Sequence, residues 1–274
     1  MRTCFYTTLN LPQKHYTPSF KSSEREVFDE NGKVLNRNTT GFFRSDLDWQ
    51  EFATFLENKY KNVEQPNITI YGCSDGTEAY SLATVLIERT PTFAYKTFPI
   101  IAKDIDQHII SKAKSEIIDS EKSDIFAINY HLNGKFNHYF QTCGTRNPDF
   151  DFGLKPKKPL YDKIIFKQAN ILEDIQNLPN KNNIILCRNM WKYLGKENHN
   201  YLAQQLYEKT KHNGLVVIGS YDTKSEFADN DLAFDTHDVD IDKVLKQNGF
   251  RETNIKKVYE PIKINTIPYH AIYQ

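Results

Sequence analysis

Hydrophobic positions along the chain follow two spacings, one typical of short buried strands and one typical of amphipathic helices. Buried strands are predicted from the apolar runs at 68–71, 98–102, 183–187 and 215–219. Helical spacing of apolar residues predicts helices over 46–60, 78–89, 107–118, 197–211 and 240–247. Because strand and helix alternate in this order, we expect an α/β protein with a doubly wound, mainly parallel sheet covered by helices on both faces.

This alternation is interrupted in the middle of the chain and is missing at its start. Residues 123–162 are rich in Asn, Gly, Pro and aromatics, and we expect an inserted loop region or a small antiparallel subdomain there. Residues 1–37 are expected to form an arm, with a hairpin at Glu30–Lys33, whose Asn-Gly pair is a turn signal. The tail alternates in a way that predicts two antiparallel edge strands. The expected division is therefore an arm over 1–37 and one domain over 38–274 that contains the 123–162 insertion.

Charge and composition indicate which binding partners and which cellular compartment to expect for the protein. The 35 basic and 35 acidic side chains cancel, so no global charge favours nucleic acid or an anionic membrane. No apolar stretch approaches the roughly 18 to 20 residues of a membrane span, and the first residues do not resemble a signal peptide. We therefore expect a cytoplasmic protein with neither a nucleic acid partner nor membrane insertion.

The cysteines point to the same compartment. All four are far apart, with no Cys-x-x-Cys pair, which disfavours a disulfide framework, a zinc site or another metal centre. Cys73 and Cys187 stand at the ends of apolar runs, where buried free cysteines commonly lie.

A loop with two glycines, Gly72-Cys-Ser-Asp-Gly76, follows the first predicted strand of the sheet. Glycine lets a backbone approach a ligand closely, and the start of the next helix presents unpaired N–H groups to an anion. The loop matches neither the Gly-x-Gly-x-x-Gly dinucleotide fingerprint nor a phosphate loop. A small ligand that carries a carboxylate fits better than a pyrophosphate, although a tight strand-to-helix turn would give the same pattern.

Acidic residues stand at the tip of the next predicted strand, in Lys103-Asp-Ile-Asp106. An acid at this position is well placed to accept hydrogen bonds from a ribose diol. Asp104 is the preferred candidate, and Asp106 is the candidate to cap the following helix, although a capping role is open to either residue.

Two further segments combine polar and aromatic residues. Cys187-Arg-Asn leaves a buried strand, and Arg188 is interpreted either as a ligand contact or as a surface ion-pair partner. Upstream, Phe42 and Phe43 stand beside Arg44, a pattern that also fits a core anchor followed by a surface charge.

Taken together, five segments in this order resemble the CheR-type chemotaxis receptor protein-glutamate methyltransferases. The matching motifs are Asn-x-Thr-x-Phe-Phe-Arg at 38–44, Gly-x-Ser-x-Gly-Glu-Glu-x-Tyr-Ser at 72–81, Asp-Ile-Asp at 104–106, Phe-x-x-x-Asn-Leu-Leu at 166–172 and Cys-Arg-Asn-x-x-x-Tyr-Phe at 187–194. The chain departs from them at Thr77, Ile171 and Leu194, which replace Glu, Leu and Phe. Members usually carry a helical domain before the first motif. The residues before Asn38 do not read as a helical bundle, so that domain is expected to be lacking.

The resemblance implies a Rossmann-like methyltransferase sheet that binds S-adenosylmethionine (SAM) and releases S-adenosylhomocysteine (SAH). It implies that Glu78 and the Gly72 loop hold the methionine part, and that Asp104 takes the ribose hydroxyls. Arg44 and Tyr193 would face the methyl group and the acceptor as catalytic residues. The implied cofactor-binding residues are Asn38, Thr40, Arg44, Gly72, Cys73, Ser74, Glu78, Asp104, Ile105, Asn170, Ile171 and Asn189.

The chemistry of the acceptor can be weighed on physical grounds. A carboxylate with a pKa of about 4 is already ionised at neutral pH, so its methylation requires no strong general base. An amine acceptor would need a deprotonation route, and no obvious basic dyad is present. The expected acceptor is therefore a protein that presents glutamate side chains. Two alternatives stay open: a methyltransferase of the same fold with another acceptor, and a non-catalytic module that binds SAM.

Overall fold

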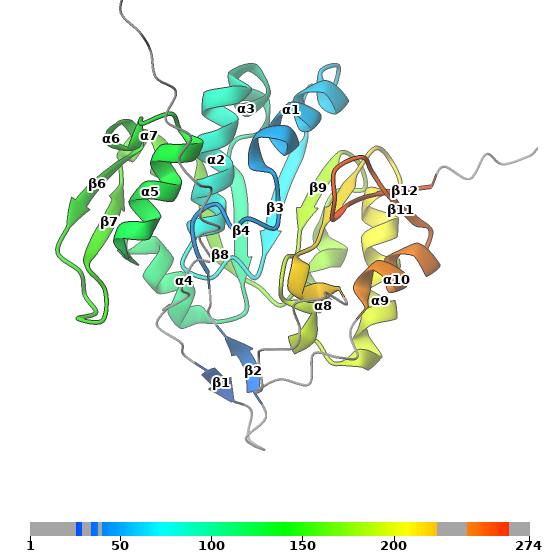
Figure 1. Ribbon diagram of the computed structural model, residues 1–274. Coiled ribbons are helices and arrows are strands. Elements are labelled where there is room, and N and C mark those ends of the chain that lie inside the picture. The colour runs from blue at the N-terminus through cyan, green and yellow to red at the C-terminus, as the bar shows by residue number, and fades with distance from the viewer. Residues whose placement is uncertain (1–25, 29–33, 38–39, 224–239, 263–274) are drawn as a thin grey trace, which may run out of the picture.

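The computed structural model describes residues 26–28, 34–37, 40–223 and 240–262, and its centre is a seven-stranded sheet between layers of helices (Figure 1). The sheet has the order β11-β12-β10-β9-β3-β4-β8. Its strands are β3 (Asn67–Tyr71), β4 (Ile100–Asp104), β8 (Ile164–Gln168), β9 (Asn183–Leu186), β10 (Leu215–Val217), β11 (Phe250–Glu252) and β12 (Val258–Pro261). Strands β10, β9, β3, β4 and β8 are parallel, and β12 is antiparallel to both β10 and β11. The predicted doubly wound α/β class and the two antiparallel edge strands are confirmed.

Helices bury both faces of this sheet, which explains why its inner strands are mostly apolar. One core contains Ile184 and Leu186 of β9, and the other contains Ile185 between them. The first core is covered by α1 (Trp49–Tyr60), α2 (Thr77–Arg89), α3 (Pro91–Thr97) and α4 (Gln107–Lys114). The second is covered by α8 (Ile171–Asp174), α9 (Lys196–Thr210) and α10 (Ile241–Gln247). A strand buried on both faces has no polar side, so its sequence is a run of apolar residues rather than an alternation of apolar and polar residues.

Several predicted boundaries are wrong, each for a local reason. The helix predicted to reach residue 118 ends at Lys114, and Ile118 instead begins a strand. The strand predicted at 98–102 is displaced, because α3 occupies the residues up to Thr97 and β4 begins only at Ile100. Helix α1 begins at Trp49 rather than at residue 46, because Asp48 caps it: its Oδ1 accepts from two backbone N–H groups.

A second, three-stranded antiparallel sheet is inserted between α4 and β8, and it lies at the left in Figure 1. It contains β5 (Ile118–Ser120), β6 (Phe140–Cys143) and β7 (Phe152–Pro156), in the order β5-β7-β6. Around it lie α5 (Lys122–His131), α6 (Phe136–Tyr139) and α7 (Lys158–Tyr161). The antiparallel form of the insertion is thus confirmed, with its first strand beginning five residues before the expected start.

The amino-terminal segment contributes one short antiparallel pair, β1 (Glu26–Phe28) with β2 (Val34–Arg37). These strands flank the hairpin expected at Glu30–Lys33, and the turn itself lies outside the described residues. The separation of an arm over 1–37 from a domain over 38–274 stays a prediction. Within the described part of the chain, no helix combines the length and the apolar character that crossing a bilayer requires.

Candidate functional site

A cavity lies at the point of the sheet where the order in which the chain adds strands reverses. From β3 the chain adds β4 and β8 on one side and then returns to add β9 and β10 on the other, so β3 and β9 border the switch point. Ligands of such sheets bind beyond the carboxyl ends of the strands at this point. A cavity of about 180 Å³ lies there. Its lining is Tyr71, Gly72, Ser74, Asp104, Ile105, Ala169, Asn170, Ile171, Leu172, Arg188, Asn189, Met190, Tyr193 and Leu194.

The loop after β3 forms one wall of the cavity and needs its first glycine. Gly72 has φ +68°, and a Cβ there would lie 3.3 Å from Cβ of Met190. Ser74 also has a positive φ, and its N–H donates to Oδ2 of Asp104 at 2.9 Å. The buried Oγ of Ser74 has no hydrogen-bond partner among the described residues. A buried hydroxyl left unpaired costs free energy, so a polar ligand group that bonds to it would be favoured.

The two aspartates at the tip of β4 have different environments. Asp104 is 3% exposed, and its Oδ1 accepts from the N–H of Asp106 at 3.0 Å. Burial raises the pKa of Asp104, although the N–H groups of Asp106 and Ser74 act against that rise. Asp104 is also one of the residues that line the cavity. Asp106 instead caps α4, since its Oδ1 accepts from the N–H of His108 at 2.8 Å.

Arg188 forms a buried ion-pair cluster with two carboxylates from distant parts of the chain. Its Nη1 donates to Oε2 of Glu78 at 2.7 Å, and its Nη2 donates to Oδ1 of Asp46. The side chain of Arg188 is 1% exposed, so the interpretation of Arg188 as a surface ion-pair partner is wrong. Burial raises the pKa of Glu78 despite the opposing charge of Arg188. Burial also opposes ionisation of Asp46, but Arg188 and the N–H of Ser220 hold the pKa of Asp46 below its usual value.

A further buried carboxylate, Asp222, joins the loop after β9 to the loop after β10. It accepts from the N–H groups of Gly219 at 2.9 Å, Asn189 at 2.5 Å and Trp191 at 3.2 Å. Asn189 adopts φ +58° and accepts at Oδ1 from the N–H of Tyr221 at 3.0 Å. A Cβ on Gly219 would lie 2.0 Å from that Oδ1, so a side chain there would displace the Asn189 amide from its hydrogen bond with Tyr221. The cavity wall at Asn189 is therefore held by residues that sequence analysis did not select.

The contribution of Asp222 to the stability of the fold should depend on pH. Burial raises the pKa of Asp222 to about 7, while the three N–H groups act against that rise. An unfolded aspartate has a pKa of about 3.9. Because the folded value is the higher one, the contribution of Asp222 to stability is complete below about pH 3.9 and is lost as the pH rises through about 7.

We therefore expect the difference in unfolding free energy between the wild type and Asp222→Asn to shrink as the pH rises across that range. Urea unfolding at several pH values measures it, with Asp149→Asn, at an exposed position, as the control. A difference that does not change with pH would contradict this role.

The two predicted catalytic residues are linked by ring contacts, although only Tyr193 lines the cavity. Tyr193 ends the short helix η2 (Trp191–Tyr193) and lines the cavity. Arg44 is half-buried, and its guanidinium lies 5.5 Å from the ring centroid of Tyr221, on η3 (Ser220–Asp222). The ammonium of Lys192 lies 5.1 Å from the ring centroid of Tyr193 and 5.6 Å from that of Tyr221. Arg44 and Tyr193 are thus connected through Tyr221 and Lys192.

The other predicted cofactor residues fall into two groups. Ile171 and Ile105 line the cavity, and Asn170 lines it while capping α8 through the N–H of Leu172. Of the described predicted residues, Thr40, Arg44, Cys73 and Glu78 are not among those lining it. Thr40 hydrogen-bonds through its hydroxyl to Thr77 at the start of α2. Asn38 lies outside the described residues.

The buried cysteines have the environment expected for a structural role. Cys73 is 1% exposed and Cys187 is fully buried, and both are free thiols. Burial raises the pKa of each thiol well above its ordinary value, which makes a thiolate nucleophile unfavourable at either position.

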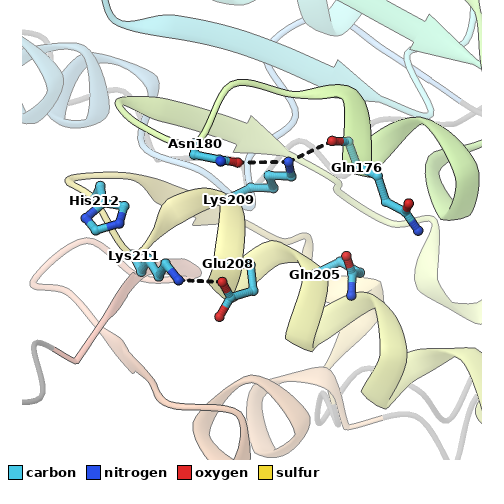
Figure 2. A pocket seen from close by; sticks show the side chains of 7 residues that line it. All are labelled: Gln176, Asn180, Gln205, Glu208, Lys209, Lys211 and His212. Atoms are coloured by element: carbon cyan, nitrogen blue, oxygen red, sulfur yellow. Dashed lines mark hydrogen bonds and ion pairs between the residues drawn. The ribbon is translucent and has the colours of Figure 1, made fainter.

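A second hollow lies away from the switch point, between α9 and the loop before β9 (Figure 2). There Nζ of Lys209 donates to the carbonyl oxygen of Gln176 and to Oδ1 of Asn180, while Lys211 pairs with Glu208. The polar groups of Lys209 and Lys211 thus have partners within the hollow. None of the predicted site residues lies among those lining it. The cavity at the switch point is therefore the candidate site.

Comparison with known proteins identifies the family. Residues 38–238 match the family described as "CheR methyltransferase, SAM binding domain". The chain is 26% identical over 199 residues to a chemotaxis protein methyltransferase of Borreliella burgdorferi, covering 69% of this chain and 65% of that protein. It is 26% identical over 187 residues to the chemotaxis protein methyltransferase of Salmonella typhimurium, covering 68% and 60%. The chain therefore spans less than two thirds of the length of these relatives.

Solved structures provide a more distant likeness. The magnesium protoporphyrin IX methyltransferase of Synechocystis PCC 6803, solved with bound SAM, is 12% identical with a TM-score of 0.35, and the match covers 77% of each chain. The family assignment rests on the match over residues 38–238, which includes every residue that lines the cavity. The chain belongs to the CheR methyltransferase family and carries the SAM-binding domain of that family.

Proposed function

We propose that the protein transfers the methyl group of SAM to a carboxylate of a protein acceptor. The observation that carries this proposal is the cavity at the switch point, which the Gly72 loop, Asp104 and Tyr193 line. Arg44 does not line it but is linked to Tyr193 through ring contacts of Tyr221 and Lys192. The family match supports SAM as the methyl donor. The relatives named chemotaxis protein methyltransferases support a protein acceptor.

The residues of the cavity suit the chemical groups of SAM. The carboxylate of Asp104, which lines the cavity at the tip of β4, suits a ribose diol. Arg188 offers a cation to the methionine carboxylate, and its buried Nε has no hydrogen-bond partner among the described residues. Glu78 does not line the cavity but is bonded to Arg188, so it would act on the methionine part through that guanidinium. Ile105 and Ile171 provide apolar surface for the adenine ring.

The chain's own residues would contribute positioning rather than proton transfer. When bound, SAM supplies an activated methyl group. The acceptor carboxylate is ionised at neutral pH, so no general base needs to act on it. Arg44 would orient this carboxylate by charge-assisted hydrogen bonds. The hydroxyl of Tyr193 would steer the attacking oxygen. Since a tight ion pair makes a carboxylate a poorer nucleophile, we assign Arg44 to orientation and not to activation.

Two measurements test the donor and the acceptor separately. Calorimetry with SAH should show binding to the folded protein, and the absence of heat would refute the whole proposal. Labelled SAM incubated with a lysate of the source cell should label a protein that releases methanol under mild base, because a carboxyl methyl ester hydrolyses easily. A label that resists base would indicate another acceptor, and binding without any transfer would indicate a non-catalytic module.

The role of Tyr193 gives a sharper expectation. Tyr193→Phe should bind SAH as the wild type does but transfer the methyl group about tenfold more slowly, which corresponds to losing about 1.4 kcal/mol of transition-state stabilisation. Single-turnover transfer from labelled SAM measures the rate. Tyr95→Phe is the matched control, because Tyr95 is 88% exposed on α3. Weaker SAH binding by Tyr193→Phe with an unchanged rate would contradict the assignment.

A further inference from the structure

One carboxylate joins the carboxyl ends of two neighbouring strands to the short helix beside them. Asp174, the last residue of α8, accepts at Oδ2 from the hydroxyl of Tyr71 at 2.5 Å and from Nζ of Lys103. Nζ of Lys103 also lies 5.3 Å from the ring centroid of Tyr71, within the range in which a cation is attracted to an aromatic face. These three residues, called the Asp174 cluster below, therefore connect β3, β4 and α8 through a single carboxylate oxygen.

The register of the sheet explains why the two strand residues of the cluster meet. Tyr71 of β3 pairs with Lys103 of β4 in the parallel register, so both side chains leave the same face of the sheet. That face is the one that α8 covers, because Tyr71 belongs to the core that also contains Ile171 and Ile175. The side chain of Lys103 is only 9% exposed, and a lysine is rarely buried unless it is paired. Asp174 supplies the opposite charge that Lys103 needs at this position.

The cluster is bonded to the wall of the cavity that the start of α8 provides. Three neighbouring residues of that wall line the cavity: Asn170, Ile171 and Leu172. Because α8 has only four residues, it has little stability of its own and depends on contacts with the rest of the fold. The N–H of Asp174 donates to the carbonyl oxygen of Asn170 at 2.9 Å, so the residue that joins α8 to the strands is bonded to its capping residue. Tyr71 lines the cavity itself, whereas Lys103 and Asp174 do not. The position of this wall therefore depends on two residues outside the lining.

We propose that the residues of the Asp174 cluster position the adenosine part of SAM, by fixing the start of α8 against the ends of β3 and β4. The adenosine part is the relevant one, because Asp104 of β4 is assigned to the ribose and Ile171 of α8 to the adenine ring. This inference rests on the part of the proposed function that puts SAM in the cavity, and it does not depend on the acceptor. It gives a role to Tyr71, Lys103 and Asp174, which adjoin three of the motifs without belonging to any of them.

Calorimetry with two ligands tests this role: SAH, and methylthioadenosine, which keeps the adenosine but lacks the amino acid part. Asp174→Asn should bind both ligands about tenfold more weakly, because the charge-assisted hydrogen bond that holds the adenosine wall is lost. Lys103→Met should bind both severalfold more weakly, although Lys103 does not line the cavity. The double variant Lys103→Met/Asp174→Asn should bind about as weakly as Asp174→Asn alone, because residues that act as one unit do not give additive losses.

Asp242 provides a matched control, because it has the same two kinds of partner elsewhere in the fold. Its Oδ1 accepts from the hydroxyl of Tyr259 at 2.8 Å, and its Oδ2 accepts from Nζ of Lys246 at 2.9 Å. None of these three residues lines the cavity. Asp242→Asn and Asp174→Asn should both lower the midpoint of thermal unfolding, but Asp242→Asn should bind both ligands as the wild type does. Equal losses of affinity in the two variants would assign the effect to general stability and overturn the inference.

The outcomes separate this inference from the function on which it rests. Wild-type protein that binds neither ligand would refute SAM as the occupant of the cavity, and the inference with it. Wild-type binding of SAH together with unchanged affinities in Asp174→Asn would refute the positioning role alone. A loss for SAH without a loss for methylthioadenosine, or a wild type that binds only SAH, would assign the binding energy to the methionine part and overturn the inference. Additive losses in the double variant would show that Lys103 and Asp174 act separately, which would overturn the cluster as a unit.

Discussion

Arg188→Met is expected to lower the free energy of unfolding by roughly 3–5 kcal/mol, the usual cost of removing one partner from a buried ion pair. The side chains of Glu78 and Asp46 are each only 12% exposed, and both are bonded to this guanidinium. Without it, two carboxylates would remain close together in a poorly solvated position. Methionine fills a similar volume but offers no donor, so the loss reports on charge and hydrogen bonding more than on packing.

Urea unfolding measures this change, and the chain offers a matched control in Lys158→Met. Lys158 pairs with Asp162 at i,i+4, but its side chain is 81% exposed. Exposed pairs of this kind are screened by solvent and contribute little to stability, so the control should unfold close to the wild type. Adding Glu78→Gln to Arg188→Met should recover part of the loss, because one uncompensated carboxylate is removed. Equal, small effects of Arg188→Met and Lys158→Met would show that the cluster does not hold the site together.

The central sheet could be predicted from the sequence because burial on both faces makes its strands uniformly apolar. All four residues of β9 are buried, and after Asn183 the chain shows an uninterrupted apolar run from Ile184 to Cys187. Strand β8 lies at the edge of the sheet, and its Ile165, Lys167 and Gln168 are exposed, so no such run marks it. Helix α3 has seven residues, too few to show a helical period. The unpredicted elements are thus those that are short or half-exposed.

The candidate site was predictable where a residue stands directly at a strand tip, as Asp104 does. It was not predictable where a role depends on a partner far along the chain. Arg188 meets Asp46, 142 residues away, and neither spacing nor composition indicates that contact. Asp222 and Tyr221 follow the apolar run at 215–219 as an ordinary polar loop would. Only the fold shows that one is buried beneath three N–H donors while the other lies exposed between two cations.

Asp104→Ala should weaken SAH binding by roughly 10- to 100-fold, since a hydrogen bond to a charged group contributes about 1.5–3 kcal/mol. The loss would have two sources: a ribose diol would have no carboxylate to donate to, and the N–H of Ser74 would lose the acceptor that holds the Gly72 loop. Asp106→Ala is the matched control, because it removes a carboxylate two residues away that caps α4. It should cost about 1 kcal/mol of stability and leave SAH affinity unchanged. Calorimetry gives the affinities and thermal unfolding gives the stabilities. If Asp106→Ala weakened SAH binding as much as Asp104→Ala, the assignment of the ribose to Asp104 would be wrong. The carboxylate of Asp106, which caps α4, would then matter as much as that of Asp104, which lines the cavity.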